Sequence, residues 1–167
     1  MAEKYKMLTG DERLEYKGKK LDFTILRYWQ LNLSVLLLNM TRGGFAEYLV
    51  LCALSGVMDD ALKQVKSGME EFDIDGPMIT IGGETRRSRI EVKSTAAVQL
   101  NSPENEEVQL RDSQLTFNIE ERITATDPVK KRHSDLYVFC HYTAKKKSDD
   151  ILNLDFWVFL RLSDIYD

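Results

Sequence analysis

The alternating stretch at residues 88–95 constrains the fold more than any other part of the chain. Ile90 and Val92 alternate with Glu91 and Lys93, which is the two-residue period of a strand with one buried face. Glu91 and Lys93 therefore point to the same side. A carboxylate there can hold a hard divalent cation through oxygen, and an ammonium can stabilise developing negative charge or position an attacking water. On these residues alone, a surface pair of opposite charges is the alternative interpretation.

A metal site of this kind needs a second acid from a neighbouring strand, and the segment 71–75 also alternates. Asp73 and Asp75 have the same parity, so periodicity does not choose between them. Asp75 directly precedes Gly76 and suits a turn. A third acid, Glu47, falls near the first turn of a predicted helix, where the helix dipole favours a carboxylate whether or not it has a chemical role.

Taken together, these segments resemble the restriction-endonuclease-like superfamily, the PD-(D/E)xK nucleases, and most of all a small bacterial group of uncharacterised members of that fold. The resemblance runs from about residue 21 to the end of the chain. The order and spacing of its pieces are more specific than any one motif. The pieces are residues 42–48, 72–74, 90–95 with Gln99, 135–140 and 156–159.

The resemblance implies an α/β (α+β) fold with a central mixed β-sheet flanked by helices. The family places its acid after an aromatic and before an aliphatic residue, which selects Asp73. The implied activity is metal-dependent hydrolysis of DNA phosphodiester bonds, in restriction, defence or repair; the alternative is a nuclease-fold module that binds nucleic acid or protein without cutting. Homodimers are common in this fold. The implied catalytic residues are Asp73, Glu91, Lys93, Glu47 and Gln99, with Asp73, Glu91 and Glu47 holding one or two Mg²⁺ ions, for which Mn²⁺ can substitute.

Length and charge limit the other possibilities. The 167 residues predict a polar lead-in at 1–20 and one domain at 21–167. The net charge of −4 argues against binding nucleic acid through global charge, but it allows local basic faces. Two basic clusters are candidates for phosphate contact, with a solvated loop as the alternative for each: Arg86, Arg87 and Arg89 before the catalytic strand, and Lys130, Lys131 and Arg132 in a polar turn.

Hydrophobic periodicity predicts the remaining elements. We expect a helix over 21–39, or two helices with a break near Asn32, an interruption at 41–44, and a second helix over 44–54. A polar, helix-like connector follows at 59–68. The turns at Gly76-Pro77 and Gly82-Gly83 divide an antiparallel meander. The expected strands are 71–75, 78–82, 87–95, an extended segment within 108–119, a central apolar strand at 136–142, and 156–162.

The cellular compartment is predicted from the N-terminal segment, the length of the apolar runs and the cysteines. The first 20 residues are charged and have no apolar core of a signal peptide, and no apolar run approaches the ~20 residues that span a bilayer. Cys52 and Cys140 lie in apolar segments and are interpreted as buried thiols of a reducing, cytoplasmic compartment. His133 and His141 with these cysteines give no zinc spacing.

Overall fold

The protein has an α+β architecture in this computed structural model, which describes residues 7–64, 71–104, 106–108, 117, 119, 121, 123 and 129–161. Within these residues a four-stranded mixed sheet has the order β3-β4-β5-β6, and a separate two-stranded sheet pairs β1 with β2. The elements are β1 (Arg13–Tyr16), β2 (Lys19–Thr24), α1 (Ile25–Leu33), α2 (Asn39–Leu54), β3 (Ile74–Ile81), β4 (Glu84–Ala96), β5 (Leu136–Tyr142) and β6 (Trp157–Arg161), with short 3₁₀ turns at Ala61–Lys63 and Leu154–Phe156.

The long strand β4 organises the larger sheet. It pairs antiparallel with β3 through a hairpin and parallel with β5, whose other edge pairs antiparallel with β6. The parallel register places Glu91 beside Tyr137 and Lys93 beside Phe139. The turn at Gly82-Gly83 is confirmed, with positive φ at both glycines, and the predicted strand 136–142 is confirmed as an interior strand with the same bounds.

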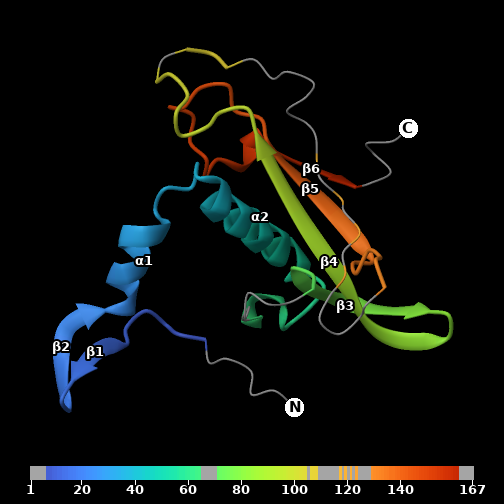
Figure 1. The fold of residues 1–167 in the computed structure, drawn as a ribbon, viewed down its shortest axis with the longest axis horizontal. Coiled ribbons are helices and arrows are strands. Elements are labelled where there is room, and N and C mark those ends of the chain that lie inside the picture. Colours follow the sequence, from blue (N-terminus) through green and yellow to red (C-terminus); the bar gives the residue numbers. More distant parts are fainter. Residues whose placement is uncertain are drawn as a thin grey trace.

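Helix α2 covers one face of this sheet (Figure 1). The hydrophobic core consists of buried residues of α2 that pack against even-numbered positions of β4 and β5. The members from α2, β4 and β5 are Ala46, Leu49, Val50, Ile90, Val92, Ala96, Cys140 and Tyr142, and Ile74, Ala144 and Trp157 complete the cluster. Because side chains alternate along a strand, Glu91 and Lys93 project from the opposite face, together with Phe139 and His141 of β5. The ring of Phe117 packs against Phe139 on that face, with a centroid distance of 4.6 Å.

The first part of the chain differs from its prediction. Instead of a polar lead-in followed by a helix from residue 21, β1 and β2 form a hairpin, and α1 begins only at Ile25, where Thr24 accepts a hydrogen bond from the Arg27 N–H as N-cap. The capping hydroxyl and the antiparallel pairing outweigh the helical spacing of residues 21–24. Figure 1 shows β1, β2 and α1 standing away from the four-stranded sheet, and no residue of α1 is buried.

Helix α2 also begins earlier than predicted. Its first residue is Asn39, and the expected interruption at 41–44 lies inside the helix. Gly43 and Gly44 are tolerated there because each costs only about 1 kcal/mol relative to alanine, which packing of the buried face offsets. Glu47 is consequently in the third turn, too far from the N-terminus for the predicted interaction with the helix dipole. The expected break near Asn32 is close to the observed one, at residues 34–38.

Gly76-Pro77 is a bulge, although the sequence predicted a turn there between two strands. Strand β3 continues through both residues, with a register shift between Asp75 and Met78. Proline is accepted because β3 is an edge strand. Most of the extended segment expected at 108–119 lies outside the described residues. None of the helices in the described residues is of a length and apolarity that would cross a membrane.

Candidate functional site

Glu91 and Lys93 form an ion pair on the face of β4 that α2 does not cover. Lys93 Nζ lies 2.5 Å from Glu91 Oε1. The Glu91 side chain is 11% exposed and that of Lys93 is 25% exposed. The pair is thus largely removed from water, so its electrostatic interaction is stronger than that of a surface pair.

Asp73 is hydrogen-bonded to the two residues of β4 that flank Glu91. Its backbone N–H donates to the Ile90 carbonyl at 2.9 Å, and its Oδ2 accepts the Val92 N–H at 2.7 Å. The two bonds hold Asp73 against the residues on either side of Glu91. These bonds place the Asp73 carboxylate at the backbone of β4 next to Glu91, on the strand that also carries Lys93.

Asp75 has different contacts. The structure therefore distinguishes Asp73 from Asp75, between which periodicity did not choose. It lies opposite Arg89 in the β3–β4 register. Its backbone N–H and carbonyl are both bonded to the side chain of Gln64, at 2.9 Å and 2.7 Å. Asp73 is therefore the acid beside Glu91.

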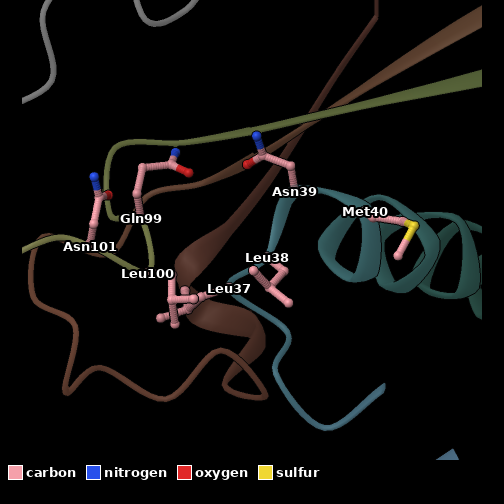
Figure 2. A pocket seen from close by; sticks show the side chains of 7 residues that line it. All are labelled: Leu37, Leu38, Asn39, Met40, Gln99, Leu100 and Asn101. Carbon is pink, nitrogen blue, oxygen red and sulfur yellow. The ribbon is translucent and has the colours of Figure 1, made fainter. Parts of the chain in front are cut away.

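Glu47 and Gln99 do not join this group. Glu47 is on α2, whose buried residues pack on the other face of the sheet. Gln99 follows the end of β4, and its amide Nε2 donates to the Ala96 carbonyl at 2.7 Å. It lines a shallow groove of about 500 Å³ together with the start of α2 (Figure 2). That groove contains neither Glu91 nor Lys93.

The candidate metal ligands at the site are the carboxylates of Asp73 and Glu91. Among the residues that the structure describes, no three His, Cys, Asp or Glu side chains are grouped to hold a metal ion, so the predicted set of Asp73, Glu91 and Glu47 is not assembled. Mg²⁺ is commonly held by one or two carboxylates, with water and substrate phosphates completing an octahedron. Asp73 and Glu91 fit that requirement.

The three arginines predicted to contact phosphate have partners within the protein. Arg86 makes a bidentate pair with Asp135, with both N–O distances 2.7 Å. Arg87 Nη2 lies 2.6 Å from Asp60 Oδ2, and the Arg89 guanidinium lies 5.7 Å from the centre of the Phe72 ring. The hydrogen bond from Arg86 is the main cause that holds the pKa of the Asp135 carboxyl below its usual range.

The segment before β5 contributes residues that the sequence reasoning missed. Ser134 Oγ lies 3.4 Å from Glu91 Oε2, and the buried His133 places Nδ1 3.3 Å from Glu71 Oε2. The sequence placed His133 at the end of a polar turn and gave Ser134 no role. No local pattern in the sequence marks these residues, because their position depends on the parallel pairing of β4 with β5. Lys130, Lys131 and Arg132, just before them, are exposed.

The comparisons with known proteins add no assignment to this geometry. No protein-family model, no curated protein and no solved structure matches the chain.

Proposed function

We propose that this protein is a metal-dependent endonuclease that hydrolyses DNA phosphodiester bonds, with the restriction-endonuclease-like fold. The observation that supports the proposal is that the Asp73 carboxylate is bonded to the β4 backbone next to Glu91, whose own carboxylate pairs with Lys93. Two carboxylates can hold a divalent ion, and an ammonium beside them can stabilise the charge that develops on a phosphate.

Asp73 and Glu91 are the residues that would hold Mg²⁺, or Mn²⁺ in its place. A bound divalent ion supplies positive charge for the phosphate oxygens and makes a water molecule easier to ionise. The protein's own part is to keep both carboxylates in position, which the Val92 N–H does for Asp73 and the Lys93 ammonium and Ser134 hydroxyl do for Glu91.

Lys93 is the residue we assign to the phosphate and the attacking water. It is one-quarter exposed, so a substrate on this face of the sheet can reach it. Its three N–H donors allow it to keep the Glu91 contact while it donates to a second oxygen. A fixed donor aimed at developing charge in a partly dry site contributes about 10²–10³ in rate.

Substrate DNA would be held by exposed basic side chains near the site. Lys130 and Arg132 are exposed on the segment that leads to Ser134, whose hydroxyl contacts Glu91. Binding through such contacts weakens steeply as salt is raised. Restriction, defence and repair are all consistent with this activity.

The test is nicking of supercoiled plasmid with Mg²⁺, Mn²⁺ or a chelator. We expect cutting by the wild type with either ion, none with the chelator, and at least a 100-fold slower rate for Lys93→Ala. Equal cutting by the wild type and Lys93→Ala would show that a contaminating nuclease is responsible and would remove the support for the proposal.

A second candidate function is a module of the same fold that binds nucleic acid without cutting. Salt-sensitive DNA binding with no cleavage under either metal would select this function over the first.

A further inference from the structure

The N-terminal arm, residues 7–33, leaves most of its apolar side chains in contact with solvent. This arm consists of β1, β2 and α1 and stands away from the four-stranded sheet (Figure 1). On the hairpin, Tyr16 is 64% exposed and Phe23 is 61% exposed. No residue of α1 is buried, and none of the buried hydrophobic residues of the protein lies in the arm. The arm therefore has no hydrophobic core of its own.

The two faces of the β1–β2 hairpin differ in charge. On one face, Arg13 Nη1 lies 3.5 Å from Asp22 Oδ1 and Lys20 Nζ lies 2.7 Å from Glu15 Oε2, so these charges are paired within the hairpin. Because side chains alternate along a strand, the residues between them form an apolar face. The apolar members of this face are Leu14, Tyr16, Leu21 and Phe23. Lys19, next to the turn, is the one charged residue of the two strands on that face.

An arm of this kind is not stable without a partner. A single two-stranded hairpin is marginally stable at best in water. A helix of fewer than about 12–15 residues is marginal as well, and α1 has 9 residues, none of which is buried against the hairpin. The exposed ion pairs of the hairpin add at most about 1 kcal/mol each. The apolar surface must therefore be covered for the arm to keep this structure.

We propose that the apolar surface of the arm binds the same surface of a second copy of the chain, giving a homodimer with twofold symmetry. A twofold interface requires a patch that is complementary to itself. An apolar face with Lys19 at its end meets this requirement, because no like charges oppose each other at its centre. Every folded molecule has the same surface to cover, and a second copy is always present to cover it.

The exposed area agrees with a dimer. The arm has nine exposed large hydrophobic residues. At roughly 150–250 Å² for each fully exposed large side chain, half exposure of nine of them presents roughly 700–1,100 Å². A standard interface buries about 800 Å² on each partner.

The charge of the arm favours a protein partner over other occupants. Residues 7–33 contain five basic and four acidic side chains, so the arm lacks the excess of positive charge that binds nucleic acid or an anionic lipid surface. The interface is separate from the Glu91–Lys93 pair, and it stands whether or not the protein cleaves DNA.

The experiment measures the mass of the full chain by sedimentation equilibrium between about 0.1 and 100 μM, since interfaces of this size bind with micromolar or tighter Kd. We expect twice the 19.3 kDa of one chain at the upper concentrations. Tyr16→Glu places a carboxylate on the apolar face and should raise the Kd at least ~30-fold. Tyr48→Glu, at a similarly exposed tyrosine of α2, is the matched control and should dimerise like the wild type.

Hydrogen exchange of the same proteins links the dimer to the arm. We expect the amides of β2 to lose protection on dilution and in Tyr16→Glu, while those of β4 and β5 keep theirs. A monomeric wild type, undiminished dimerisation of Tyr16→Glu, or equal protection of β2 in monomer and dimer would overturn the proposal. With a monomeric wild type, loss of binding to single-stranded DNA or to anionic vesicles in Tyr16→Glu would assign the face to that partner instead.

Discussion

The Asp73 carboxylate takes the position of a strand carbonyl: its Oδ2 accepts the Val92 N–H at 2.7 Å, just where β3 begins to pair with β4. The backbone N–H of Asp73 bonds to the Ile90 carbonyl on the other side of Glu91. The acid is therefore part of the sheet as well as of the candidate site. Any test of its chemical role must keep the acceptor in place.

Asp73→Asn keeps that acceptor while it removes the charge. We expect this variant to unfold at nearly the wild-type denaturant concentration and to lose at least 100-fold in metal-dependent cutting, because an amide is a much poorer ligand than a carboxylate for Mg²⁺. Asp73→Ala should lose about 1–3 kcal/mol of folding free energy as well, since it leaves the Val92 N–H without its acceptor. Urea unfolding and plasmid nicking measure the two effects. Normal cutting by Asp73→Asn would exclude Asp73 as a ligand.

The Glu91–Lys93 pair predicts a strong coupling between two substitutions. Lys93→Met leaves Glu91, at 11% exposure, without its counter-ion and should cost about 1–3 kcal/mol. Glu91→Gln has the converse effect. The double variant removes both charges and should be closer in stability to the wild type than the sum of the single variants. Denaturant unfolding of all four proteins gives this cycle. Additive losses would show that the pair is no more than a solvated contact.

Much of the larger sheet was predictable because its strands follow simple periodicities. Alternation at 88–95 located β4 and the shared face of Glu91 and Lys93, and the apolar run at 136–142 located β5. These features depend on local alternation and short turns, which a sequence shows directly. The family pattern selected Asp73, but the turn predicted at Gly76-Pro77 would have put strand 78–82 between Asp73 and β4, whereas the continuous strand β3 brings Asp73 next to Glu91.

Other features depend on contacts that a linear pattern does not show. Residues 21–24 have helical spacing, but pairing with β1 makes them a strand. The Arg86–Asp135 pair joins residues far apart in the chain, so a cluster that was interpreted as free cations is partly neutralised. Ser134 reaches Glu91 only because β5 runs parallel to β4. In each case tertiary pairing decides what local propensity leaves open.

Gly76 is expected to tolerate no side chain. A Cβ built there would lie 2.2 Å from Ser88 Oγ and 2.6 Å from Ile90 Cδ1, and overpacking of this kind costs about 1–3 kcal/mol. Gly44→Ala is the matched control. A Cβ at Gly44 meets nothing within 4 Å, so alanine in the helix should stabilise the protein by about 0.5–1 kcal/mol. Unfolding in urea measures both, and equal effects would contradict the close packing of β3 on β4.

The buried His141 should make the folded protein less stable in mild acid. Burial lowers the pKa of His141, and its Nε2 is buried without a partner among the described residues. The folded state therefore binds the proton less well than the unfolded state. The stabilisation that the folded state gains from an uncharged His141 is fully present above the unfolded pKa of about 6.5. It is lost as the pH falls below that value, so the free energy of unfolding decreases. Urea unfolding between pH 7.5 and pH 5 should show a steeper fall for the wild type than for His141→Gln. Parallel curves would show that His141 protonates equally in both states.

The Arg86–Asp135 pair predicts which basic residues bind DNA. Because both terminal nitrogens of Arg86 are bonded to Asp135, Arg86→Ala should change DNA affinity little. Alanine at Lys130, Lys131 and Arg132 together should weaken binding and reduce the slope of log K against log salt by about 0.9 for each phosphate that is no longer neutralised. Asp135→Asn tests the same relationship in the opposite direction, since it removes the charge that holds Arg86 and should raise the slope by up to about 0.9. Fluorescence anisotropy of a labelled duplex between roughly 50 and 200 mM salt, a range over which binding of this kind weakens steeply, measures all three. If Arg86→Ala reduced the slope as much as the triple substitution does, the intramolecular pair would have to open when DNA binds.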